Sequence, residues 1–168
     1  MSLDRDSGDV FGALLDSWGE KEGLQYFRRL AKQEVVIRSG HTLQAQLLAA
    51  GEVDLVPWSH AQRPLLMADA GAPLGVNFLQ PVLSKAQVLL LARRSPHPHA
   101  AALFIDWALS EEGQTFVGID IVRPPVRTGQ KQKYMELGRP RTKVITPEFL
   151  GQNYDRYTKL FHEVFGVK

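Results

Sequence analysis

The sequence predicts an α/β fold in which helices cover a largely parallel sheet. Segments with helical periodicity alternate along the chain with short segments rich in β-branched residues. One short segment, AQVLLLA (86–92), is apolar on both faces, which is typical of a strand covered by helices on both sides. We therefore expect three layers, with the sheet between two layers of helices.

Composition narrows the class of protein. The chain has 168 residues, 44% apolar and 23% charged, with a net charge of +2, which indicates a soluble globular domain or one piece of a larger protein. Its basic residues are not clustered as in nucleic-acid-binding proteins, and its apolar runs are too short to span a bilayer. The absence of cysteine excludes disulfides, thiolate nucleophiles and cysteine-based metal sites.

The first half of the chain shows three helical patterns before residue 52. Two helices are expected at 9–19 and 20–33, the second with an apolar face that includes Phe27. A strand at 34–40 follows, and then a helix at 41–51. Its expected packing face consists of Leu43, Leu47 and Ala50.

The next segments predict further strands and one helix. A strand is expected at 52–58, ending near Pro57 because proline cannot donate to a strand ladder. A helix at 60–71 follows, and 72–78 alternates apolar with small or polar residues. Residues 121–129 read as a proline-rich loop.

Proline and hydroxyl residues mark the starts of the later helices. One helix should begin at Pro98 with His97 as its N-cap, and Ser110 should begin the next. The first of these should pack through Ala101, Phe104, Ile105 and Ala108. The last helix should begin at Thr146 and Pro147. Its apolar face consists of Leu150, Tyr154, Tyr157, Phe161 and Val164.

Two short segments are candidates for ligand binding. RSGHT lies between a strand and a helix start, where free N–H groups with Ser39, Thr42, Arg38 and His41 could receive an anion. PWSH follows the strand at 52–58, and open α/β sheets bind ligands at such strand ends. There Trp58, Ser59 and His60 offer an aromatic wall and two polar groups. N-capping and core packing are the competing interpretations.

Other motifs favour structure over chemistry. His97 and His99 flank the first residue of a helix and point to different sides, so we interpret them as a helix start and not as a metal site. Ser59 beside His60 lacks the nucleophile-elbow pattern, and phosphate-loop, zinc-protease and dinucleotide motifs are missing. No catalytic residue, cofactor or resident metal is expected.

The order of several segments resembles the C-terminal half of extracellular solute-binding proteins of ABC transporters. The segments are GLQYFRRLAKQ, LLAAGEVDLV, GAPLGVNFLQPVL, SPHPHAAALFIDWALSEEGQ and PPVR, and the likeness runs from about Leu24 to Phe165. The likeness is to the branch that includes ferric-iron, polyamine, thiamine and phosphonate binders. It implies an incomplete type II periplasmic-binding-protein-like fold, with most of lobe two and the C-terminal part of lobe one.

The resemblance also implies a division of the chain. Residues 1–3 look vector-derived, 4–79 would form most of the second lobe, 80–95 would cross back, and 96–168 would return to the first lobe. The signal peptide and the start of the first lobe would lie outside this chain. Because that leaves a surface uncovered, a homodimer of this chain is one expected partner state.

The function that the resemblance implies is solute binding without catalysis. A periplasmic or exported protein would trap a small polar or anionic solute between two lobes and deliver it to an ABC membrane permease, with no nucleic-acid partner. The implied ligand residues are Arg38, Ser39, Gly40, His41, Thr42, Trp58, Ser59 and His60. Alternatives are a metal-ion (iron) carrier using His41 and His60, an enzyme, and a regulatory ligand-sensing domain. Ferric binders have a tyrosine pair where this chain has Trp58, Ser59 and His60, which disfavours iron.

Overall fold

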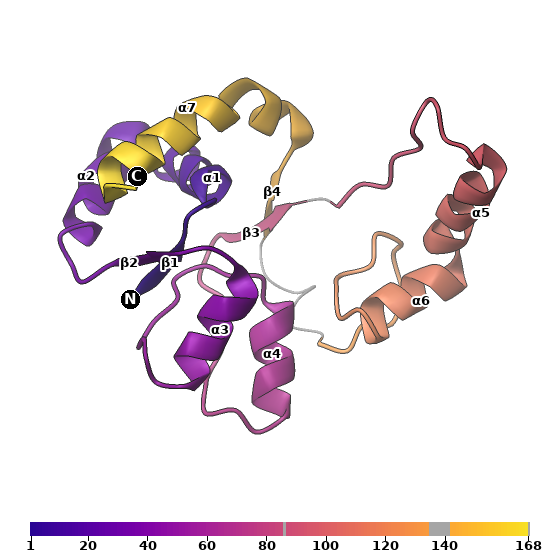
Figure 1. The fold of residues 1–168 in the computed structure, drawn as a ribbon, viewed down its shortest axis with the longest axis horizontal. Helices are drawn as coiled ribbons and strands as arrows, with labels where there is room; N and C mark the ends of the chain where they lie inside the picture. The colour runs from indigo at the N-terminus through magenta and orange to yellow at the C-terminus, as the bar shows by residue number, and fades with distance from the viewer. Residues whose placement is uncertain (86, 135–141, 168) are drawn as a thin grey trace. The chain divides into compact units, whose positions relative to one another are not determined.

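A computed structural model describes residues 1–85, 87–134 and 142–167. The chain divides into two compact units (Figure 1). Unit 1 consists of Met1–Lys85 with Thr142–Lys168, and unit 2 of Ala86–Arg141. The structure thus groups 142–167 with the start of the chain. The sequence-based division instead placed these residues in one segment, 96–168, with the helices that precede them. The reason is the packing of the last helix on the first, described below.

Unit 1 is built on three helices that share one core. They are α1 (Gly8–Trp18), α2 (Glu20–Leu30) and α7 (Pro147–Phe165). Phe11, Phe27 and Phe161 are fully buried, and the Phe11 ring lies 4.7 Å from Phe27 and 5.7 Å from Phe161 between centroids. Aromatic rings bury more apolar area than most side chains, so this cluster contributes strongly to the hydrophobic stabilisation of unit 1.

Two small parallel sheets accompany these helices. In the first, β1 (Ser2–Asp4) pairs with β2 (Val36–Arg38); in the second, β3 (Val82–Lys85) pairs with β4 (Thr142–Ile145). Ser2 and Leu3 are fully buried in β1, so two of the three residues expected to be vector-derived belong to a buried strand. Two shorter helices, α3 (His41–Ala49) and α4 (Gln62–Asp69), complete unit 1.

Unit 2 contains α5 (Pro98–Leu109) and α6 (Glu111–Ile119). The Ser110 hydroxyl accepts a hydrogen bond from the Gly113 N–H and caps α6. Gln114 is buried, and its amide group donates to the Ala108 carbonyl and accepts from the Val126 N–H, both at 2.7 Å. This one side chain therefore ties the proline-rich loop to both helices.

The helix predictions are confirmed, and several strand predictions are wrong. The fold is mixed α/β, with seven helices and small parallel sheets in the described residues. Segments 52–58, 72–78 and 87–92 form no strand, while β1, β3 and β4 were not expected. The 52–58 segment is linked to β1 by a backbone hydrogen bond in which the Ser2 N–H donates to the Leu55 carbonyl. A single bond of this kind does not form a strand ladder.

The expected packing face of α3 is wrong, and that of α5 holds except at Phe104. On α3, Leu43 is exposed while Gln44 and Ala45 are buried. On α5 no residue is fully buried, but Ala101, Ile105 and Ala108 are half-buried as predicted, and Phe104 alone of that face is exposed, at 54%. The α7 face is confirmed at Tyr157 and Phe161. In the described residues, no helix combines the length and apolar character needed to cross a membrane.

Candidate functional site at the ends of β1 and β2

The carboxyl ends of β1 and β2 meet the start of α3 through Asp4. Asp4 Oδ2 accepts hydrogen bonds from the Gly40 N–H at 2.8 Å and from the Gln44 side-chain amide at 3.1 Å, and Oδ1 accepts from the Asp6 N–H at 2.9 Å. Asp4 and Gln44 are both buried. The carboxylate therefore fixes the RSGHT loop against β1, at the edge where parallel sheets place their ligand sites.

RSGHT forms the turn between β2 and α3. Gly40 has φ +99°, a conformation that L side chains rarely adopt, and it is the N-cap of α3 without a side chain that could cap it. Arg38, Ser39 and Thr42 are exposed, and Arg38 Nη1 donates to the Ile37 carbonyl. The loop thus presents a helix start and a guanidinium to solvent.

His41 joins the two sequence-predicted segments. Its ring lies 4.3 Å from that of His60 between centroids, at an interplanar angle of 74°. Its Nδ1 atom lies 3.9 Å from Asp4 Oδ2, which is too long for a hydrogen bond. The His41 side chain is 33% exposed, so the pair is open to a ligand from solvent.

The PWSH side chains contact different neighbours. The Trp58 ring contacts the core, with its centroid 6.1 Å from that of Phe27, while His60 lies against His41. Within the described residues, Trp58 Nε1, Ser59 Oγ and Gln44 Oε1 are buried without a hydrogen-bond partner. Buried polar atoms without a hydrogen bond are energetically costly.

The sequence did not indicate Asp4 or Gln44 as site residues. Asp4 follows residues that looked vector-derived, and Gln44 lay outside the expected apolar face of α3. One signal was available, because an aspartate directly after an apolar residue at a strand end often binds backbone N–H groups.

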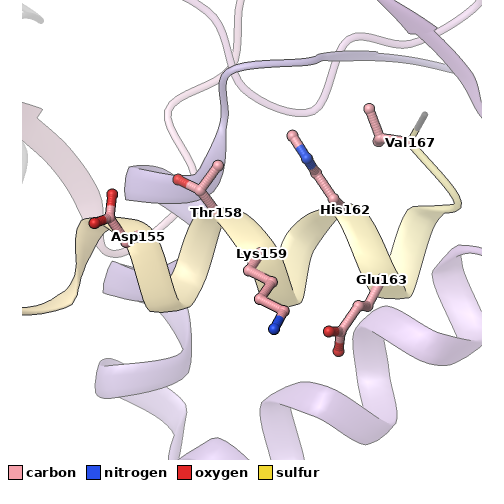
Figure 2. Close-up of a pocket in the computed structure, with 6 residues that line it drawn as sticks. All are labelled: Asp155, Thr158, Lys159, His162, Glu163 and Val167. Atoms are coloured by element: carbon pink, nitrogen blue, oxygen red, sulfur yellow. The ribbon is translucent and has the colours of Figure 1, made fainter.

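A separate hollow of about 440 Å³ lies along α7 (Figure 2). Thr158 and His162 project to one side of the helix, and Lys159 and Glu163 to the other. All six lining residues come from 155–167, so one helix and its end form the whole wall. None of the residues that the sequence predicted to bind ligand line this hollow.

Comparison with known proteins gave no match, either to a protein-family model, to a curated protein or to a solved structure. The site must therefore be interpreted from its own chemistry. In the described residues, no group of three His, Asp or Glu side chains is arranged to hold a metal ion. Two imidazoles beside a helix start can donate hydrogen bonds to the oxygens of a small polar or anionic molecule.

Proposed function

We propose that this chain is part of a solute-binding protein of an ABC-type import system. It would capture a small polar or anionic solute at the His41–His60 pair and deliver it to a membrane permease, as an exported or periplasmic component without catalytic activity. The observation that carries the proposal is the 4.3 Å separation of these two rings. They come from the two segments that the sequence resemblance assigned to ligand binding.

The electrostatics of the site favour a ligand with oxygen acceptors. The start of α3 carries partial positive charge, Arg38 is exposed beside it, and either imidazole becomes cationic when protonated. Asp4 opposes an anion, but its oxygens already accept hydrogen bonds from Asp6, Gly40 and Gln44. Its role is to position the loop, and the imidazoles face the solute.

The test measures binding with matched histidine variants. A panel of phosphonates, sulfonates, thiamine-like compounds and polyamines is screened by thermal shift, and each hit is titrated by calorimetry against His41→Ala, His60→Ala and His99→Ala. His99 lies in the first turn of α5 in unit 2 and serves as the control. We expect a hit whose affinity falls about tenfold or more in the first two variants, as loss of a charged hydrogen bond implies, and stays unchanged in the third. A panel without hits, or equal effects of all three substitutions, contradicts the proposal.

A metal-ion carrier is the second candidate, favoured by the carboxylate beside His41. Metal-binding histidines commonly donate one ring N–H to a carboxylate, and His41 Nδ1 lies 3.9 Å from Asp4 Oδ2, near that carboxylate but not hydrogen-bonded to it. Calorimetric titration of the chain with Fe³⁺ and Zn²⁺ separates the two functions. An unchanged metal affinity in His60→Ala removes the metal carrier, and tight metal binding that depends on both histidines replaces the solute proposal.

A further inference from the structure

The helices of unit 2 carry an apolar surface that nothing in the unit covers. No residue of α5 is buried, and Leu103 and Phe104 are 70% and 54% exposed. A helix with apolar residues on several faces is normally buried, and exposed apolar patches of this kind mark interaction surfaces. Unit 2 therefore has the character of one side of an interface.

A groove where α5 ends and α6 begins indicates the chemistry of the partner. It has a volume of about 650 Å³ and is lined by Trp107, Glu111, Glu112, Thr115, Phe116 and Asp120, here called the acidic groove. The Trp107 and Phe116 rings lie 6.0 Å apart between centroids. Aromatic walls with three carboxylates suit an occupant that carries apolar side chains and cationic groups, and arginine fits both.

The same unit contains a segment with this composition. Residues 88–94, VLLLARR, are here called the leucine–arginine segment. Its four large apolar side chains are 46% to 85% exposed, and Arg93 and Arg94 are exposed as well. The segment forms no strand in the described chain. With such exposure it does not fill the acidic groove of its own copy.

We propose that two copies of this chain associate reciprocally, the leucine–arginine segment of each lying in the acidic groove of the other. Complementary charge selects this occupant, because Arg93 and Arg94 meet Glu111 and Glu112, while Leu89–Leu91 cover Trp107 and Phe116. The exchange is two-fold symmetric, so each contact occurs twice and the assembly closes as a dimer. The inference is independent of the solute site, which lies in unit 1.

Charge reversal tests this dimer without altering buried residues. The full chain is studied by sedimentation velocity as wild type, as Arg93→Glu/Arg94→Glu, and as Glu111→Lys/Glu112→Lys. The wild type should dimerise at micromolar concentration, more weakly at high salt, since the interface is small and charged. Each variant should weaken dimerisation about tenfold or more, because like charges then face each other. Mixing the two variants should restore a dimer, because every contact regains opposite charges.

The control is Arg28→Glu/Arg29→Glu, which reverses two exposed charges on α2 of unit 1. It should leave dimerisation unchanged, and circular dichroism should show all variants folded. A wild type that stays monomeric at about 200 μM overturns the proposal, because its self-association is then weaker than an interface of this size implies. The proposal is also overturned if both charge-reversed variants dimerise as readily as the wild type. It is overturned as well if the mixture of the two variants stays monomeric.

Discussion

Asp4 and Gly40 are joined by a 2.8 Å hydrogen bond that spans 36 positions of the sequence. The acceptor is a buried carboxylate at the end of β1, and the donor is the backbone N–H of the residue that precedes α3. This bond sets where α3 begins, and with it the position of His41 beside His60. The candidate site therefore depends on a residue that need not touch the ligand.

Replacing Asp4 with asparagine should destabilise unit 1. One carboxylate oxygen becomes an NH₂ group, which cannot accept a hydrogen bond, so at least one of the donors Gly40, Gln44 and Asp6 loses its partner. We expect a loss of about 1–3 kcal/mol in the free energy of unfolding, measured by urea denaturation. Asp6→Asn is the control, because the Asp6 side chain is exposed, and its effect should stay within about 0.5 kcal/mol. Equal losses in both variants would contradict this role of Asp4.

Two ion pairs of unit 1 should differ in strength because they differ in burial. Lys85 Nζ lies 2.7 Å from Asp9 Oδ2, and the Asp9 side chain is only 9% exposed. Lys143 Nζ lies 2.6 Å from Asp16 Oδ2, where the Asp16 side chain is 51% exposed. Water screens the second pair more effectively. Double-mutant cycles to alanine should give a coupling energy of about 1 kcal/mol or more for the first pair and less than about 0.5 kcal/mol for the second. The reverse order would show that burial does not decide these energies.

The helices were predictable because their signals are local. Thr146 and Pro147 mark the start of α7, and the Thr146 hydroxyl does accept from the Phe149 N–H at 3.2 Å. Strands depend on partners far away in sequence, so composition alone does not identify them. Segment 52–58 has the right residues yet lacks a ladder, whereas β4 includes a half-buried lysine, Lys143, and still pairs with β3. Burial of Gln44 likewise follows from its distant partner Asp4, which no periodicity reveals.

The candidate site was predictable only where local signals indicate it. Proximity to strand ends and a helix start identified His41 and His60, and the structure brings these two rings together. The Trp58 indole, in contrast, packs against Phe27 of the core. The distinction depends on which way adjacent side chains point in an irregular segment, and a sequence pattern does not specify this.

Removing the Gln114 side chain should loosen the proline-rich loop of unit 2. Gln114→Ala leaves the Val126 N–H and the Ala108 carbonyl without their 2.7 Å partner. We expect hydrogen exchange in 121–127 to quicken about tenfold or more, since one buried hydrogen bond contributes about 1–1.5 kcal/mol to local stability. Gln87→Ala, at an exposed position, is the matched control. Unchanged exchange in 121–127 would mean that the loop is held by other contacts.

The close approach of α1 and α7 depends on glycine at position 12. A Cβ atom there would overlap the Tyr157 ring, whereas a Cβ atom at Gly151 of α7 would meet nothing within 4 Å. Alanine is favoured over glycine in a helix by about 0.5–1 kcal/mol. Gly151→Ala should therefore stabilise the protein by that amount.

In Gly12→Ala the same gain is opposed by a steric cost. Forcing an extra methyl group into a packed interior costs about 1–3 kcal/mol, because Tyr157 is buried between the helices and must shift with them. We expect a net loss of about 1–2 kcal/mol, measured by urea denaturation beside Gly151→Ala. The two substitutions are chemically identical and both lie in helices, so opposite signs isolate packing from propensity. A stabilising Gly12→Ala would show that α1 and α7 lie farther apart than this core requires.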